Sequence, residues 1–523
     1  MLLSLLVCAP ALAAPEPQDV LPPHIVVVMV DDLGARDTSP AVWPIDGMTE
    51  GSPRHFLTPH LDGLAKQGLV HDEAYASAPV CTPTRTSFIT GCSPARTGIT
   101  YWTKDAGKDT SAGHPLLAAP PWRLDGLQPG DTTLPALLSG AGYRTIHVGK
   151  AHFGTGEGGD PTRLGFDVNV AGWAAGGPGS YYGVDGFSAD GRARRAGRER
   201  GSRAWDVPGL EEHHGEDVFL TDVLGDAAVR ELRAGVEAGE RVFLHFAPYA
   251  VHAPLMVNPR VADRFESAGL APAELAYASL VASVDDALGR ILTALDQLGI
   301  AEETIVVYTS DNGGLSAHSR GGAKHGHNAP FRSGKGSAYE GGVRVPMIVR
   351  GPGVLGGGRH TAGAVVTHDL FPTLLAAAGV PVPEARREEL DGVDLWRLWA
   401  GAGGVPERAI VWHQPHYWGV PGPGIEPFSA MRLGFYKLVY FHSGAEVDAS
   451  TGARRGGPRL ELYDLSGDLS ETSDMAATSP ELVAMLAERL SKELERRGAS
   501  MSLALPDRVP VPLPRALAAL QGR

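Results

Sequence analysis

The sequence predicts an α/β fold, in which a large, mostly parallel sheet is sandwiched by helices and a small C-terminal antiparallel sheet with one helix follows. Continuous apolar runs recur along residues 24–349, as in strands that are buried on both faces. Segments with helical periodicity alternate with these runs, which is the pattern of strand–helix–strand units. After a Gly-rich linker at 400–406 the pattern changes to short alternating strands. We therefore expect a main domain at 20–400 and a small α+β subdomain at 405–523.

The expected elements follow one another in this order along the chain. Buried strands of the main domain are predicted at 24–30, 143–148, 241–248, 304–310 and 345–349. Helices between them are predicted at 58–68, 134–142, 217–235, 272–298 and 369–379. In the small subdomain we expect a hairpin at 430–440, a strand at 461–465 and an amphipathic helix at 481–497.

Residues 155–216 are rich in glycine and only weakly periodic, so we interpret them as an insertion between the main elements. This segment contains a basic run made of Arg192, Arg194, Arg195, Arg198, Arg200 and Arg203. A solvated charged surface is the common structural meaning of such a run. A landing site for an anionic polymer is the alternative, and both interpretations stay open.

The bulk composition is that of a folded protein and excludes some partners. The chain has 523 residues, of which 43% are hydrophobic and 20% charged, enough for one large domain and a smaller one. The net charge of −14 excludes a general attraction to nucleic acid or acidic membranes. The 67 glycines and 41 prolines predict many loops between the regular elements.

The N-terminus predicts an exported protein, periplasmic or extracellular. Residues 1–14 form a short apolar run that ends in Ala11-Leu12-Ala13, the small-x-small pattern of a secretory signal peptide. This run is too short to span a bilayer, and no integral membrane segment is expected elsewhere. Lipid attachment at Cys8 is disfavoured because the large Val7 precedes it.

The segment from Val80 to Gly91, which reads VCTPTRTSFITG, predicts a short helix that begins at a cysteine. Pro83 suits the first turn of a helix, and Gly91 suits a left-handed end. The free backbone N–H groups and the helix dipole would favour an anion beside Cys81. Arg85 lies one turn further on and would point back over the same place. An ordinary helix after a buried cysteine is the alternative.

Two predicted strands end in oxygen-bearing side chains. Asp31 and Asp32 follow the strand at 24–30, and Asp311 and Asn312 follow the strand at 304–310. Ligand sites of open α/β sheets gather at the carboxyl ends of strands, and adjacent carboxylates repel each other unless a cation lies between them. Oxygen ligands of this kind suit Ca²⁺ or Mg²⁺. A turn with an aspartate helix cap is the alternative.

Further basic residues lie beyond strand ends. Lys150 and His152 follow the strand at 143–148 and would point the same way if that strand continued. His252 lies just beyond the strand at 241–248, and Lys335 lies in a glycine-rich loop. His325 and His327 lack a third metal ligand at a suitable spacing, so we expect them to be polar loop residues, and we expect Cys92 to be structural.

These motifs together resemble the sulfatase family, whose fold is alkaline-phosphatase-like. Cys81-Thr82-Pro83-Thr84-Arg85 is similar to its activation signature C-x-P-[ST]-R. Residues 149–154, GKAHFG, are similar to its G-K-W-H-x-G, with Ala151 in place of the tryptophan. The other matching segments, in family order, are Asp31-Asp32, His252-Ala253-Pro254, Ser310-Asp311-Asn312-Gly313-Gly314 and Lys335 before Glu340-Gly341-Gly342.

The resemblance implies a hydrolase of sulfate monoesters, with carbohydrates as substrates. A separate maturation enzyme would oxidise Cys81 to formylglycine, whose hydrate attacks sulfur. Arg85, Lys150 and Lys335 would neutralise the sulfate, while His252 protonates the leaving alcohol and His152 takes a proton from the hydrate. The implied ligands of Ca²⁺, or alternatively Mg²⁺, are Asp31, Asp32, Cys81, Asp311 and Asn312.

Two other functions remain open at this point. A phosphonate or phosphate ester hydrolase would use a similar metal and cationic cradle. A non-catalytic protein that binds sulfated glycans would be expected to lack some site residues, and none is missing. The substrate pocket is harder to predict: the cluster of His413, His416, Tyr417 and Trp418 would either line it or pack inside the subdomain.

Overall fold

The computed structural model describes residues 21–39, 55–199, 201–316, 324–443, 446–447, 454–455 and 457–521. The predicted signal peptide at 1–14, with Cys8, and Arg200 of the basic run lie outside the described residues. Among the helices that are described, none is both long and apolar enough to cross a membrane.

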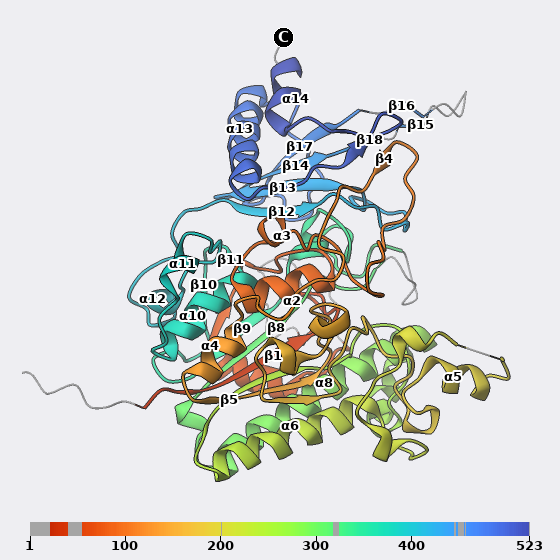
Figure 1. The fold of residues 1–523 in the computed structure, drawn as a ribbon, viewed down its shortest axis with the longest axis vertical. Helices are drawn as coiled ribbons and strands as arrows, with labels where there is room; N and C mark the ends of the chain where they lie inside the picture. The colour runs from red at the N-terminus through yellow and green to blue at the C-terminus, as the bar shows by residue number, and fades with distance from the viewer. Residues whose placement is uncertain are drawn as a thin grey trace, which may run out of the picture.

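The main sheet has eight strands in the order β10-β2-β9-β8-β1-β7-β5-β6 (Figure 1). Only β9 runs against its neighbours, since it pairs antiparallel with both β2 and β8. This confirms the expected large, mostly parallel sheet. The strand bounds are β1 His24–Val30, β2 Leu69–His71, β5 Tyr143–Gly149, β6 Val168–Val170, β7 Arg241–Ala247, β8 Thr304–Ser310, β9 Met347–Arg350 and β10 Arg359–Thr361.

The register of the central strands brings their carboxyl ends to one level. β1 pairs with β8 from His24 opposite Thr304 to Val30 opposite Ser310. β5 pairs with β7 up to Gly149 opposite Ala247. All seven residues of β1 and of β8 are buried, because helices cover both faces of the sheet. The loops that follow these four strands therefore meet at one edge of the sheet.

Two groups of helices cover the sheet, one on each face (Figure 1). On one face α6 (Leu220–Glu237) and α8 (Pro272–Gln297) pack together, with α1 (Pro59–Gln67) against α8. On the other face lie α2, α4 and α10, whose bounds are Cys81–Thr90, Leu134–Gly140 and Leu370–Ala377. Each face has its own hydrophobic core, so the layered arrangement predicted from the sequence is confirmed.

Residues 155–216 are more ordered than we expected. They contain the edge strand β6 and the short helix α5 (Ala189–Arg195). β6 pairs with β5, from Ile146 opposite Val168 onward, and its three residues are only half-buried. A strand this short and this exposed has too little apolar patterning to be recognised in the sequence.

The C-terminal sheet is antiparallel, as predicted, with the order β12-β13-β14-β17. Its strands are β12 Ile410–Gln414, β13 Phe428–Leu433, β14 Tyr436–Phe441 and β17 Arg459–Asp464. The predicted helix is α13 (Pro480–Arg496), and α14 (Pro514–Gln521) packs beside it. β12 and α14 were missed in the sequence, because one follows the glycine-rich linker and the other is only two turns long.

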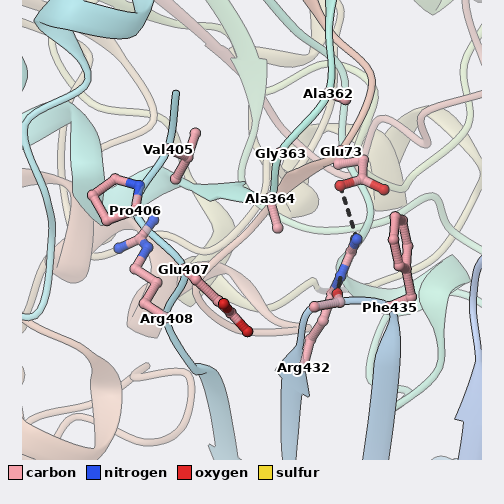
Figure 2. A pocket seen from close by; sticks show the side chains of 11 residues that line it. Glu73, Ala362, Gly363, Ala364, Val405, Pro406, Glu407, Arg408, Arg432 and Phe435 are labelled. Carbon is pink, nitrogen blue, oxygen red and sulfur yellow. Dashed lines mark hydrogen bonds and ion pairs between the residues drawn. The ribbon is translucent and has the colours of Figure 1, made fainter. Parts of the chain in front are cut away.

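The C-terminal sheet is joined to the main domain by buried polar contacts as well as apolar ones. Trp412 and Phe428 share a hydrophobic cluster with Tyr75 of the main domain. At the margin of this interface Arg432 pairs with Glu73 at 2.8 Å, beside a small pocket of about 190 Å³ (Figure 2). The sheet therefore has a fixed position from which its loops can reach the main domain.

Candidate active site

Four oxygen-bearing side chains lie at the carboxyl edge of the central strands. Asp31 and Asp32 follow β1 and Asp311 and Asn312 follow β8, and all four are fully buried. The backbone N–H of Asp32 donates to Asp311 at 3.1 Å, and Asn312 Nδ2 donates to Asp32 Oδ1 at 2.9 Å. The parallel register of β1 and β8 is what brings the two pairs together.

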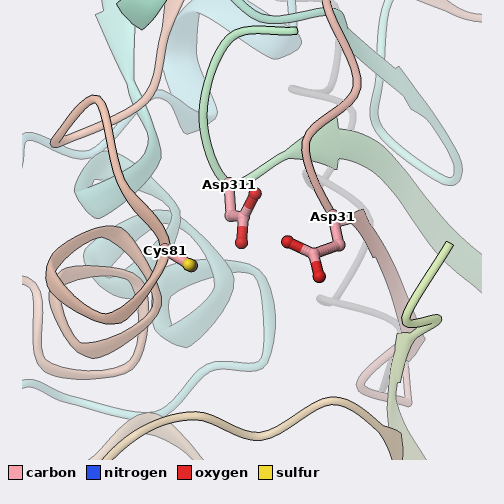
Figure 3. Close-up of side chains that lie close together, drawn as sticks. All are labelled: Asp31, Cys81 and Asp311. Atoms are coloured by element: carbon pink, nitrogen blue, oxygen red, sulfur yellow. The ribbon is translucent and has the colours of Figure 1, made fainter. Parts of the chain in front are cut away.

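Cys81 is the first residue of α2, and this helix ends at Gly91 in a left-handed conformation with φ 72°. Both features confirm the helix predicted from the sequence. The Sγ atom of Cys81 and single carboxylate oxygens of Asp31 and Asp311 all lie within 4.8 Å of one another (Figure 3). The start of α2 thus points at the carboxylate group.

Three cations surround this group. Arg85 Nε donates to Asp311 Oδ2 at 2.8 Å, and Arg85 Nη1 donates to the Lys150 carbonyl at 2.9 Å. Lys150 Nζ lies 2.8 Å from both carboxylate oxygens of Asp31. Lys335 Nζ lies 2.7 Å from Asp32 Oδ1 and 3.9 Å from Cys81 Sγ. The three carboxylates and three cations therefore form one buried ionic network.

The network shifts the pKa values of two of its carboxyl groups in opposite directions. Burial raises the pKa of Asp31 well above its ordinary value, and the repulsion of Asp311 adds to this although Lys150 opposes it. For Asp32 burial acts in the same direction, but Lys335, His252 and Lys150 together outweigh it and hold the pKa well below its usual range. Three buried carboxylates thus lie side by side, and a cation bound among them would relieve their mutual repulsion.

The donor set fits a divalent cation. Asp31, Asp32 and Asp311 offer oxygens, and Asn312 Oδ1 is buried without a hydrogen-bond partner in the part of the chain that is described. An unpaired buried carbonyl oxygen costs free energy unless something binds it. Hard oxygen ligands of this kind suit Ca²⁺ or Mg²⁺. Neither His325 nor His327 belongs to a group of metal-ligating side chains among the described residues.

Two histidines face the same site with different free nitrogens. His152 Nε2 lies 2.7 Å from the Thr103 carbonyl, so this nitrogen carries the proton, and Nδ1 has no partner among the described residues. His252 Nδ1 lies 2.7 Å from the Ala253 carbonyl, which leaves Nε2 facing Asp32 Oδ2 at 3.7 Å. Burial lowers the pKa of both rings, and Lys335 adds to the effect at His252, whose pKa falls to about 3.

The strand that precedes Lys150 and His152 does not continue through these two residues. β5 ends at Gly149, and both Gly149 and His152 have positive φ angles, 101° and 51°. The two side chains reach the site through this turn rather than by strand alternation.

A pair of glycines packs against both histidine rings, and the sequence analysis missed it. A Cβ atom on Gly177 would lie 2.4 Å from His252 Nδ1, and one on Gly176 would lie 2.8 Å from His152 Cε1. Only glycine allows the backbone to come this close. The signal in the sequence was the glycine-rich character of 155–216, which also suits an ordinary loop.

A pocket of about 290 Å³ opens over Cys81. Its lining residues are Val80, Cys81, Trp102, His152, Gly176, Trp205, His252, Ala253, Leu315, Lys335 and Trp418. Three tryptophans from distant parts of the chain form much of the wall. Of the four aromatic residues considered from the sequence, only Trp418 lines this pocket.

The other three residues of that cluster lie elsewhere. His413 is buried in the C-terminal sheet, 2.8 Å from Ser429 Oγ, and His416 stacks on Tyr101 with ring centroids 4.8 Å apart. Tyr417 packs edge-on against His114. Cys92 is a free buried thiol whose Sγ lies 3.3 Å from the Glu389 carbonyl, in agreement with a structural role.

The fold agrees with the alkaline-phosphatase-like architecture expected from the sequence. The chain belongs to the sulfatase family, because the family model described as Sulfatase matches residues 23–380. It is accordingly a sulfuric ester hydrolase, as the resemblance of its motifs implied.

Known relatives span most of the chain. Steryl-sulfatase of Mus musculus is 32% identical over 471 residues, which cover 78% of this chain and 69% of the relative. Arylsulfatase A of Homo sapiens is 30% identical over 507 residues, covering 89% and 87%. The crystal structure of Ps i-CgsB in complex with k-i-k-neocarrahexaose has a similar fold, with a TM-score of 0.70 at 23% identity, and the match covers 96% of this chain and 98% of that one.

Proposed function

We propose that this protein removes sulfate from carbohydrate sulfate monoesters, with a formylglycine made from Cys81 and a divalent cation, Ca²⁺ or Mg²⁺. The observation that carries the proposal is the position of Cys81, at the start of α2 and between Lys335 and the buried carboxylates.

The cysteine itself is a poor nucleophile in this environment. Burial raises the pKa of the Cys81 thiol, although Lys150 and Lys335 oppose the effect, so the thiol stays protonated at neutral pH. Hydrated formylglycine would supply a hydroxyl oxygen to attack sulfur, and the second hydroxyl would later allow sulfate to leave. Because Cys81 is only 4% exposed, a maturation enzyme must reach it before the chain has folded.

The cation would be held by Asp31, Asp32, Asp311 and Asn312, together with the modified residue 81. A divalent cation in this place would act as a Lewis acid and would orient the sulfate. Support comes from the buried oxygen donors and from the unpaired Oδ1 atom of Asn312.

The basic side chains have separate tasks in this proposal. Arg85, Lys150 and Lys335 would bind the sulfate oxygens and stabilise the charge that moves in the transition state. His252, with Lys335, would give a proton from Nε2 to the leaving alcohol; burial and Lys335 lower the pKa of the free ring, and a bound sulfate anion would raise it again. His152, with its unpaired Nδ1, would accept a proton from residue 81.

The pocket wall supports a carbohydrate as the alcohol part. Trp102, Trp205 and Trp418 offer flat apolar faces, on which the CH faces of a sugar ring can stack. We also propose that the protein is exported, which rests on the signal-like residues 1–14.

The test compares hydrolysis of matched aryl sulfate and aryl phosphate esters after co-expression with a formylglycine-generating enzyme. We expect sulfate release that disappears in Cys81→Ala and persists in Cys92→Ala, a matched control at the other buried thiol. Preferential phosphate release, or full activity of Cys81→Ala, would overturn the proposal. Near-normal turnover of His252→Ala would remove that residue from the mechanism.

A further inference from the structure

The rim of the pocket carries cations that the proposed chemistry does not use. Lys104 Nζ lies over the ring of Trp205, 5.4 Å from the ring centroid, and Trp205 is part of the pocket wall. No carboxylate among the described residues lies within ion-pair distance of Lys104. Its ammonium group is therefore held at the pocket wall with hydrogen-bond donors to spare.

A second cation, Arg203, lies two residues before the same tryptophan in the chain. Arg203 begins the short helix that ends at Trp205, and its side chain is 88% exposed. Among the described residues only Asp190 lies within ion-pair distance of Arg203, at a long 3.9 Å, although Arg203 also attracts the more distant Asp206. By contrast, Arg195 of the same basic run is fixed by two hydrogen bonds to Asp185, at 2.7 and 2.8 Å. Arg203 is thus free to bind something else.

The fold makes the basic run continuous with the pocket. The short helix at Arg203–Trp205 contacts α5, and a Cβ atom on Gly201 would lie 2.3 Å from the backbone of Ala189. The chain therefore folds back on itself, so that the arginines of α5 and Arg203 belong to one surface. On a protein with a net charge of −14, this local excess of positive charge attracts anions to one place.

We propose that Lys104 and Arg203 form a second anion-binding subsite beside Trp205, which binds a further sulfate or carboxylate group of the same carbohydrate. The natural substrate is then a polyanionic oligosaccharide or polysaccharide, rather than a sugar with a single sulfate. The inference rests on the proposed carbohydrate sulfatase function and names the substrate class of that site. On this proposal the basic run is a landing site for an anionic polymer, which is the second of the two interpretations that the sequence left open.

The chemistry of the rim agrees with this role. A guanidinium and an ammonium both form charge-assisted hydrogen bonds with sulfate and carboxylate oxygens. Trp205 lines the pocket, has the Lys104 ammonium over its ring and shares a short helix with Arg203, so a sugar bound at this wall would have its further substituents near both cations. An exposed subsite of this kind is sensitive to ionic strength, because salt screens its charges.

The experiment measures kcat and KM for three substrates: an aryl sulfate, a monosulfated disaccharide, and the same disaccharide with a second sulfate. The variants are Lys104→Ala, Arg203→Ala and the double variant. The matched control is Lys108→Ala, which removes an exposed lysine of the same loop that pairs instead with Asp105 at 3.4 Å.

We expect KM for the disulfated substrate to rise about 3- to 10-fold in each single variant, with kcat unchanged. The aryl sulfate and the monosulfated disaccharide should be unaffected, and Lys108→Ala should behave as wild type. Added salt should reduce the preference for the disulfated substrate in the wild type only. If the wild type shows no such preference, or the variants lose all three substrates equally, the subsite is refuted. Absence of aryl sulfate hydrolysis would instead refute the proposed function.

Discussion

The close packing of Gly177 against His252 predicts that a single methyl group will impair the enzyme. Gly177 does not have a positive φ angle, so alanine fits the backbone there. Its Cβ would however lie 2.4 Å from His252 Nδ1, where ordinary contacts begin at 3.4 Å. The ring must therefore move by about 1 Å, and a displacement of that size costs roughly 100-fold in rate.

The assay for Gly177→Ala is a series of sulfate esters that differ in the pKa of the leaving alcohol. If His252 protonates the leaving oxygen, the loss in kcat should be largest for alkyl and sugar sulfates. It should be small for a nitrophenyl sulfate, whose leaving group needs no proton. The matched control is Gly63→Ala in α1, where no atom lies within 4 Å of the added Cβ, and it should keep full activity.

Two results would refute this reasoning. The first is a Gly177→Ala enzyme with wild-type kcat on every ester, which would mean that the glycine does not fix the ring. The second is a loss that is equal for good and poor leaving groups, which would mean that His252 is not the proton donor. A thermal melt of Gly177→Ala should stay close to that of the wild type, so that unfolding does not explain the loss.

Three further predictions concern the cation and the stability of the fold. Chelation of divalent cations should abolish sulfate release and lower Tm, because a cation at 100 times its Kd adds about 2.7 kcal/mol to the free energy of unfolding; unchanged activity would exclude the metal. Lys437→Met should cost about 3–5 kcal/mol in denaturant unfolding, because Lys437 Nζ lies 2.9 Å from both Glu340 and Glu471 in the interface between the sheets. Burial opposes ionisation of Asp391, but Arg96, Arg497 and Ser93 together outweigh it and hold the pKa of that carboxyl well below 3.8. Its stabilising effect is therefore present above pH 3.8 and is lost progressively as the pH falls from 3.8 toward the lowered pKa, so unfolding curves of wild type and Asp391→Asn should differ at pH 7 and approach each other as the pH falls below 3.8.

The sequence predicted best those features that depend on local pattern. The runs at 24–30 and 304–310 are strands with these same bounds, because apolar residues dominate both runs and every residue in them is buried. The start and end of α2 followed from Pro83 and Gly91, whose backbone preferences are intrinsic. The position of the carboxylates followed from the strand ends.

The features that could not be predicted depend on contacts between distant segments. Trp102, Trp205 and Trp418 meet in one pocket wall although they come from three distant segments of the chain. Gly336 illustrates the reason: a Cβ atom there would lie 2.5 Å from the Trp418 ring, so the ring packs directly on the backbone next to Lys335. Such a contact joins the C-terminal sheet to the site, and no local pattern in either segment encodes it.

The most direct test of the account measures the state of residue 81 and the activity in the same preparations. Batches are made with increasing amounts of a formylglycine-generating enzyme, and the peptide that carries residue 81 is weighed by mass spectrometry in each batch. The account predicts that kcat per mole of protein rises in proportion to the aldehyde fraction and extrapolates to zero for the unmodified thiol. Substantial sulfate release from protein in which residue 81 is entirely cysteine would contradict it.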